Sequence, residues 1–419
     1  MTEKFLIKGN RSLQGEIEIS GYKNAAGACL AAVLLTKDEI ILDNLPLVDD
    51  VLNLIKILES IGVKVSWLDA HKIKLQADNL DISKMESELV GASRVSVLLM
   101  GSLATRFKSF KLPHPGGDRI GLRPITAHIE ALKKLGVDIE TENGFYKFNV
   151  EKLEGKEVIL KEFSVTATEI LMIAAVKAKG KTIIKQAAAE PQVCDLGEML
   201  IKMGAKIEGL GTHTIKIDGV DELHGTTHKI MPDLLEVGTF IAAGVITPGE
   251  VIIKNINIDH LDIFLDRLEE IGVNFEKGDN FLKVKYSPNI KATRIQALPW
   301  PGFPTDLLPM LIPLLTQAEG KSLVHDPLYE NRFNYVQELR KMGADIEMVD
   351  PHRIIIYGKT PLRGLNIETW DIRAGASLII AALLAEGETT IDNIHQIDRG
   401  YEKIEEKLKK LGADIERVK

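Results

Sequence analysis

Residues 338–347 read ELRKMGADIE, and five closely related stretches occur elsewhere in the chain. In each stretch, apolar residues at spacings of three and four predict an amphipathic helix, and the alternating run after the glycine predicts a strand. A glycine between them is typical of a left-handed helix C-cap. The glycines are Gly62, Gly136, Gly204, Gly272, Gly343 and Gly412, separated by 74, 68, 68, 71 and 69 residues. This near-constant spacing indicates an internal repeat of about 70 residues.

A second, more apolar helix is predicted upstream of each amphipathic helix. Residues 234–246 (LLEVGTFIAAGVI) and 374–387 (AGASLIIAALLAEG) are apolar on nearly every side, so we expect them to be buried, with the amphipathic helices outside them. Short β runs such as 250–256 (EVIIKNI) lie between the two helices. Each repeat therefore reads as βαβαββ, and six repeats predict an α/β protein with helices inside and sheets outside.

Six repeats divide most simply into two domains of three. We place the boundary near residue 230, where no Pro/Ser-rich linker occurs. The first predicted domain is 22–230, with a mobile loop at about 112–123, and the second is 1–21 together with 231–419. A ligand is expected between two such lobes, and a loop from one lobe can close over it.

Composition limits the function classes. The chain has 419 residues, 45% of them hydrophobic and 27% charged, and a formal net charge of −8. That charge argues against nucleic-acid binding, which needs clustered Lys and Arg. No apolar run has the length of a signal peptide or membrane span, so we expect a cytoplasmic protein. Cys29 and Cys194 are expected to be reduced thiols rather than a disulfide.

Standard cofactor and metal motifs are not found. The ten histidines have no zinc-site spacing, and we interpret His224 and His228 as surface residues of a DELHGTTH turn. The P-loop glycine spacing, the G-x-S-x-G elbow and C-x-x-C are also missing. We therefore expect no metal and no cofactor, and chemistry that depends on Asp, Glu, Lys and Arg.

Residues 113–124 read PHPGGDRIGLRP and form a soft loop with unusual charges. Two adjacent glycines give the backbone freedom and three prolines stiffen it, which indicates a shaped mobile loop rather than a helix or strand. The loop carries Asp118, Arg119 and Arg123, so anion chemistry is one interpretation and a solvated surface turn is the other.

Seven motifs, in order along almost the whole chain, resemble those of the UDP-N-acetylglucosamine 1-carboxyvinyltransferase family. They are ISGYKNA (19–25), PGGDRIGLRP (115–124), EVGTF (236–240), FPTD (303–306), ENRF (330–333), DIRAGASL (371–378) and IDRGYE (397–402). The resemblance implies the enolpyruvyl transferase fold, a two-domain inside-out α/β barrel. It also implies transfer of the enolpyruvyl group of phosphoenolpyruvate to the 3-hydroxyl of UDP-N-acetylglucosamine with loss of phosphate, the first committed step of peptidoglycan precursor synthesis.

The resemblance also assigns roles to particular residues. Phosphoenolpyruvate carries about three negative charges, so it needs preorganised cations. Asp306 corresponds to the family's candidate base, and Asp118 to its proton donor, with Lys23 as a third catalytic residue. The resemblance assigns phosphoenolpyruvate binding to Lys23, Arg123 and Arg399, and places Arg94, Arg332 and Arg373 nearby as supporting cations. Asn24 and Leu328 are assigned to substrate binding. Glu330 and Asp371 are expected to orient neighbouring arginines.

Helix capping is an alternative role for two of these residues. Asp306 and Asn24 each stand close to the start of an apolar stretch, and Asp and Asn are good N-caps.

Asp118 differs from the residue found in most members of the family. That position is usually cysteine, although some members carry aspartate. A carboxylate is a far weaker nucleophile than a thiolate towards soft alkylating agents. We therefore expect insensitivity to fosfomycin, the epoxide that alkylates the cysteine.

Three further departures leave the acceptor open. The family's uridine pocket usually has Asp, Lys and Gly where this chain has Thr126, Glu162 and Thr166. Lys to Glu reverses a charge beside a diphosphate. The alternatives are a divergent paralogue with another acceptor, a non-catalytic anion-binding protein, and enolpyruvylshikimate-phosphate synthase, which has a Lys-Ser pair where this chain has Lys23-Asn24.

Overall fold

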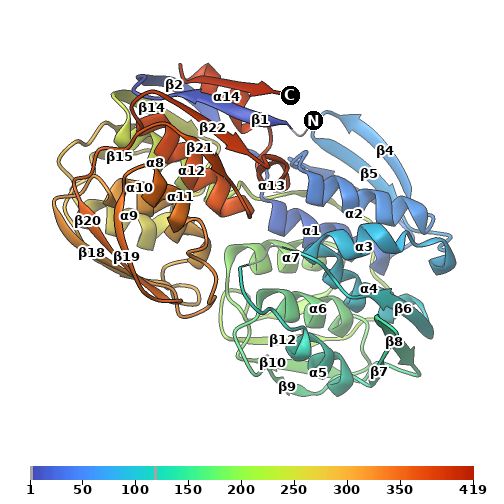
Figure 1. Cartoon of the computed structure of the whole chain (residues 1–419). Coiled ribbons are helices and arrows are strands. Elements are labelled where there is room, and N and C mark those ends of the chain that lie inside the picture. Colours follow the sequence, from blue (N-terminus) through green and yellow to red (C-terminus); the bar gives the residue numbers. More distant parts are fainter. Residues whose placement is uncertain (1–2, 118–119) are drawn as a thin grey trace. The chain divides into compact units, whose positions relative to one another are not determined.

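The computed structural model describes residues 3–117 and 120–419 and divides the chain into two compact units (Figure 1). Unit 2 comprises residues 21–117 and 123–231, and unit 1 comprises the described parts of 1–20, 118–122 and 232–419. The predicted domain boundaries were 22 and 230. The loop was predicted to belong wholly to the first domain, but its residues 120–122 cluster with unit 1.

Unit 1 contains three four-stranded sheets with one pattern. In each sheet, one pair of strands is parallel and two pairs are antiparallel. The first sheet is β15 (Phe275–Lys277), β16 (Phe281–Lys285), β14 (Gly249–Lys254) and β2 (Leu13–Glu18). The second is β17 (Arg294–Gln296), β18 (Gly320–His325), β20 (Arg353–Gly358) and β19 (Asp345–Asp350). The third is β21 (Asn366–Glu368), β22 (Glu388–Asp392), β1 (Lys4–Lys8) and β23 (Asp414–Val418).

The helices of unit 1 form an inner and an outer set. The inner helices are α8 (Leu234–Ile246), α10 (Leu308–Leu315) and α12 (Ile372–Leu384), which pack against one another. Every residue of α8 and α10 is buried, because neither helix has a polar stripe to face water. The outer, amphipathic helices are α9 (Asp262–Glu270), α11 (Val336–Lys341) and α14 (Ile404–Lys410).

Unit 2 repeats this plan with one strand fewer. Two sheets have the same mixed pattern of strands. The first is β13 (Thr227–Lys229), β3 (Glu39–Asp43), β5 (Lys72–Gln76) and β4 (Lys64–Asp69). The second is β11 (Lys206–Glu208), β12 (Thr214–Asp218), β10 (Lys181–Lys185) and β9 (Glu157–Ile159). The third has three antiparallel strands, β6 (Ser109–Pro113), β8 (Phe145–Val150) and β7 (Val137–Glu142). The inner helices are α1 (Lys23–Ala32), α4 (Leu99–Arg106) and α6 (Val165–Ala175), and the outer ones α2 (Asp49–Ser60), α5 (Thr126–Lys134) and α7 (Pro191–Lys202).

The six repeat glycines end the six outer helices in the predicted left-handed conformation. Their φ angles are +103° at Gly62, +100° at Gly136, +104° at Gly204, +89° at Gly272, +109° at Gly343 and +99° at Gly412. A side chain is strained at such angles, and a Cβ on Gly136 would also lie 2.8 Å from the Lys152 carbonyl oxygen. The repeat and the arrangement of helices inside sheets are thereby confirmed.

Within residues 3–117 and 120–419, no helix combines the length and the apolar character needed to cross a bilayer.

Candidate active site

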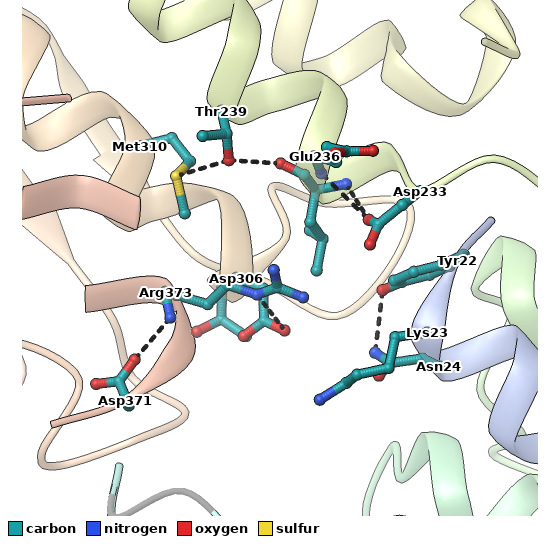
Figure 2. A network of polar contacts seen from close by, with 12 residues as sticks. Tyr22, Lys23, Asn24, Asp233, Glu236, Thr239, Asp306, Met310, Asp371 and Arg373 are labelled. Atoms are coloured by element: carbon teal, nitrogen blue, oxygen red, sulfur yellow. Dashed lines mark hydrogen bonds and ion pairs between the residues drawn. The ribbon is translucent and has the colours of Figure 1, made fainter. Parts of the chain in front are cut away.

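Asp306 is the centre of a buried charge cluster in unit 1. It lies on the 3-10 turn η5 (Thr305–Leu307), which leads into α10. Arg332 Nη2 donates to Asp306 Oδ1 at 2.5 Å. Arg373 Nε lies 3.9 Å from Asp306 Oδ2 (Figure 2). The capping alternative for Asp306 is wrong, because Pro304 and Leu307 hold the N-cap positions and neither makes a side-chain cap bond. Asp306 instead faces two guanidinium groups, and a third of its side chain is exposed.

Arg332 is fixed in this cluster by several partners at once. Its side chain is only 2% exposed, and Nε donates to the Thr305 hydroxyl at 3.2 Å and lies 3.7 Å from Asp326 Oδ2. Burial would lower the pKa of Arg332, but the charges of Asp306, Asp371 and Asp326 raise it overall. Arg332 is therefore a permanent, oriented cation.

The N-terminus of α12 supplies Asp371 and Arg373. Asp371 caps the helix, since its Oδ1 accepts from the backbone N–H of Arg373 at 2.9 Å and of Ala374 at 2.8 Å. Arg373 lies with its guanidinium carbon 5.2 Å from the centre of the Tyr401 ring. Asp371 thus fixes the backbone from which the Arg373 side chain extends.

Arg399 lies beside the same helix start. It follows α13 (His395–Asp398), and Arg399 Nη1 donates to Gln396 Oε1 at 3.0 Å. Its neighbour Gly400 packs so closely that a Cβ there would lie 2.6 Å from Ile372 Cγ2. The arginines at 373 and 399, far apart in sequence, therefore occupy adjacent elements of unit 1.

Glu330 contacts the loop. Glu330 Oε1 accepts from the backbone N–H of Leu122 at 2.7 Å, which lowers the pKa of Glu330. The Asn331 N–H donates to the Ile120 carbonyl at 3.1 Å. Glu330 was expected to orient an arginine, but the hydrogen bond described for its carboxylate goes to the loop backbone. Leu328 is 41% exposed.

Unit 2 contributes Lys23 and Asn24 from the first turn of α1. Lys23 Nζ donates to Asp50 Oδ2 at 2.8 Å, with side chains only 12% and 6% exposed. Asn24 Nδ2 donates to the Tyr22 hydroxyl at 3.1 Å and makes no cap bond, so the capping alternative is wrong here too (Figure 2). The sequence analysis missed Asp50; its only signal was the acidic pair that opens α2.

Arg94 and Arg123 meet at the described part of the loop. Arg94 Nη1 donates to the Arg123 carbonyl at 2.6 Å. Gly117, with φ +124°, lies where a Cβ would be 2.6 Å from Arg123 Nη2 and 2.9 Å from Arg94 Cβ, so this position needs glycine. Arg94 opens the 3-10 helix η3 (Arg94–Leu98), which packs against α1, the helix of Lys23. Asp118 and Arg119 of this loop lie outside the described residues.

The positions that depart from the family pattern also lie in unit 2. Thr126 and Glu162 are exposed, and the Thr166 hydroxyl lies 2.7 Å from His128 Nε2. Burial, with a smaller contribution from Arg94, lowers the pKa of His128 to about 3. His128 is therefore a neutral hydrogen-bonding group that holds Thr166 in place.

His228 was predicted at the surface, and this is wrong. It is 1% exposed, and among the described residues it forms, with Cys29 and Asp195, the one group of three ligand types close enough to share a metal ion. Lys202 Nζ lies 3.2 Å from His228 Nδ1, and an ammonium can only donate, so the ring proton is on Nε2, 3.2 Å from Asp195 Oδ2. Burial and Asp195 also raise the pKa of the Cys29 thiol. A thiol that keeps its proton is a poor metal ligand, because the thiolate is the form that binds a metal.

The chain matches known enolpyruvyl transferases along its whole length. The family model described as EPSP synthase (3-phosphoshikimate 1-carboxyvinyltransferase) matches residues 7–408. Curated relatives named UDP-N-acetylglucosamine 1-carboxyvinyltransferase come from Koribacter versatilis, 43% identical over 99% of this chain and 96% of the relative, and from Acidobacterium capsulatum, 42% identical over 99% and 96%. A third, from Caldanaerobacter subterraneus subsp. tengcongensis, is 42% identical over 100% of both chains.

Solved structures agree with these matches. The enolpyruvyl transferase NikO from Streptomyces tendae has a TM-score of 0.91 at 25% identity, covering 100% of this chain and 99% of that chain. EPSP synthase from Acinetobacter baumannii has a TM-score of 0.76 at 19% identity over 100% of both chains, which supports the fold alone.

Proposed function

The chain belongs to the UDP-N-acetylglucosamine 1-carboxyvinyltransferase family, and we propose that it transfers the enolpyruvyl group of phosphoenolpyruvate to the 3-hydroxyl of UDP-N-acetylglucosamine. The observation that carries the proposal is identity of 42–43% with relatives of that name over 99–100% of the chain. The reaction is the first committed step of peptidoglycan precursor synthesis, and we place it in the cytoplasm.

Binding of phosphoenolpyruvate depends on cations that are held in place before the substrate arrives. We assign Lys23, Arg123 and Arg399 to the phosphate and carboxylate, with Arg94, Arg332 and Arg373 in support. The buried Lys23–Asp50 pair and the buried Arg332 support this role, because their positions are already fixed. Oriented cations stabilise charge changes at C2 without reorganisation.

Asp306 is assigned as the base. It takes the proton of the 3-hydroxyl as the oxygen forms a bond to C2 of phosphoenolpyruvate, while C3 gains a proton. Loss of a proton from C3 then re-forms the C2–C3 double bond and expels phosphate, as the bond between C2 and the phosphate oxygen breaks. The sugar oxygen stays bonded to C2, which leaves the enolpyruvyl ether. Asp118 is assigned as the donor to C3, and Asn24 and Leu328 to binding of the sugar nucleotide.

Release of phosphate from phosphoenolpyruvate with UDP-N-acetylglucosamine tests the proposal. We expect release that requires both substrates, and a loss of kcat of about a hundredfold or more in D306N, because a positioned base contributes about 10²–10⁴. The matched control D345N, at an exposed carboxylate of β19, should retain activity. Binding of both ligands without turnover would instead identify a non-catalytic anion-binding protein.

A different acceptor is the second candidate. The exposed Glu162, at a position where the family usually carries lysine, is the observation that favours it. The same assay with other hydroxyl compounds decides the matter. Phosphate release with another acceptor, and none with UDP-N-acetylglucosamine, would replace the proposed substrate.

A further inference from the structure

Asp326 is a buried carboxylate that the reaction scheme above does not use. It directly follows β18 and is 0% exposed. Its backbone is bound on both sides by His352, whose carbonyl accepts from the Asp326 N–H at 2.8 Å and whose Nδ1 lies 2.7 Å from the Asp326 carbonyl. A buried carboxylate is costly unless its oxygens have partners.

The two oxygens of Asp326 do different things. Oδ1 accepts from the N–H groups of Leu328 at 2.8 Å and Tyr329 at 3.2 Å, which shapes the turn after β18. Oδ2 accepts from the Thr305 hydroxyl and lies 3.7 Å from Arg332 Nε. Oδ1 therefore stabilises the turn after β18, and Oδ2 contacts the two residues that lie next to Asp306.

Both partners of Oδ2 act directly on Asp306. Thr305 precedes Asp306 on η5, so fixing its side chain fixes the backbone that carries the base. Arg332 donates to Asp306 Oδ1 at 2.5 Å and to the Thr305 hydroxyl at 3.2 Å. Asp326, Thr305, Arg332 and Asp306 thus form a continuous hydrogen-bonded and ion-paired array inside unit 1.

We propose that Asp326 is a positioning residue for enolpyruvyl transfer, which sets the orientation and basicity of Asp306 through Thr305 and Arg332. The inference rests on the proposed function of Asp306. Because Asp326 is fully buried, it acts only through these neighbours.

The charge of Asp326 also matters to the base. Arg332 and Arg373 face Asp306, and Asp326 and Asp371 lie behind them as counter-charges. Loss of the Asp326 charge leaves Arg332 less compensated, so the ionised form of Asp306 is favoured more strongly. A carboxylate that is harder to protonate is a weaker base.

The D326N variant separates the turn from the array. An asparagine oxygen can still accept from Leu328 and Tyr329, but the amide NH₂ cannot accept from Thr305 or Arg332. T305V removes the same link from the other side with little change in volume, and T305S restores the hydroxyl. D345N, at an exposed carboxylate of β19, is the control.

Steady-state phosphate release from pH 5 to 9 is the kinetic test. We expect D326N and T305V to lower kcat by about tenfold to a hundredfold, as small displacements of a catalytic group do, with KM within about threefold. The acid limb of the D326N profile should move to lower pH, while T305S and D345N resemble the wild type. Unchanged kcat and pH profile in D326N or T305V, in an active enzyme, would overturn the inference.

A titration of Asp306 followed by NMR tests the inference without any turnover, and so does not depend on the proposed function. Carboxyl ¹³C resonances of labelled aspartates can be followed against pH, with D306N used to assign Asp306. The Asp306 midpoint should be lower in D326N than in the wild type. Equal midpoints would refute the inference, whereas absence of phosphate release by the wild type would refute only the proposed function. If D326N does not fold, the T305V and T305S pair carries the test.

Discussion

The partners of Asp306 are charged side chains that are already held in place in the protein without substrate. The Asp306 carboxylate lies against Arg332 and Arg373, which are 2% and 4% exposed, so water cannot replace them as partners. Such groups are held by neighbours rather than ordered by the substrate, and fixed dipoles and charges lower a barrier most when they need not reorganise. Because these arginines are buried, removal of the carboxylate partner of either one should lower the stability of the folded protein.

Asp233 is expected to make stability depend on pH. It caps α8 through the N–H groups of Leu235 and Glu236. Burial raises its pKa from 3.8 to about 6, with Arg373 acting in the opposite direction. The folded state therefore binds the proton more tightly than the unfolded chain, so this stabilisation is complete below the unfolded pKa and is lost as pH rises through 6.

Comparison of the wild type with D233N isolates this effect, because asparagine caps a helix equally well. Between pH 7 and pH 5 the wild type should gain about 1 kcal/mol of unfolding free energy relative to D233N. Denaturant unfolding at both pH values measures the difference. The exposed control D345N should show no such change, and a constant difference between D233N and wild type would rule out the shifted carboxyl.

Asp118 should determine the response to fosfomycin. The expectation rests on its side chain alone, because a carboxylate attacks an epoxide far less readily than a thiolate does. Incubation of the wild type with fosfomycin should leave activity and intact mass unchanged, and D118C should gain a covalent adduct and lose activity. Stoichiometric modification of the wild type would contradict this.

At the scale of elements, the C-cap glycines should contribute measurably to stability. Gly136→Ala combines a φ of +100° with a Cβ 2.8 Å from the Lys152 carbonyl, whereas Gly180→Ala meets only the strain of φ +92° with open space around it. We expect Gly180→Ala to lower the free energy of unfolding by about 1–2 kcal/mol, and Gly136→Ala to lower it by more. Gly91→Ala, in the helix α3 (Ser87–Ala92), should be neutral or stabilising. Chemical unfolding gives the order, and equal effects at all three positions would argue against the cap.

The sequence predicted the elements better than the contacts among them. Periodicity and a glycine are local signals, so each C-cap such as Gly343 could be read directly. Asp326 and His228 were missed or misplaced, because their burial depends on partners far away in the chain, Thr305 for one and Lys202 for the other. The capping hypothesis for Asp306 failed for the same reason. The capping rule considers only neighbouring residues, whereas the partner of Asp306 is Arg332, which lies 26 residues further along the chain.

For the whole molecule, the cations assigned to phosphoenolpyruvate are divided between the two units. Each unit has its own sheets, inner helices and cations, with Lys23, Arg94 and Arg123 in unit 2 and Arg332, Arg373 and Arg399 in unit 1. A trianionic substrate is neutralised well only by several cations at once. We therefore expect that removal of an assigned cation from either unit weakens phosphoenolpyruvate binding.

The most direct test is a crystal structure with phosphoenolpyruvate and UDP-N-acetylglucosamine bound to D306N, which should be slow enough to retain both. The account predicts that Lys23, Arg123 and Arg399 contact the same phosphoenolpyruvate molecule, with residue 306 beside the 3-hydroxyl of the sugar. Phosphoenolpyruvate bound by one unit only, or a sugar hydroxyl far from residue 306, would contradict it.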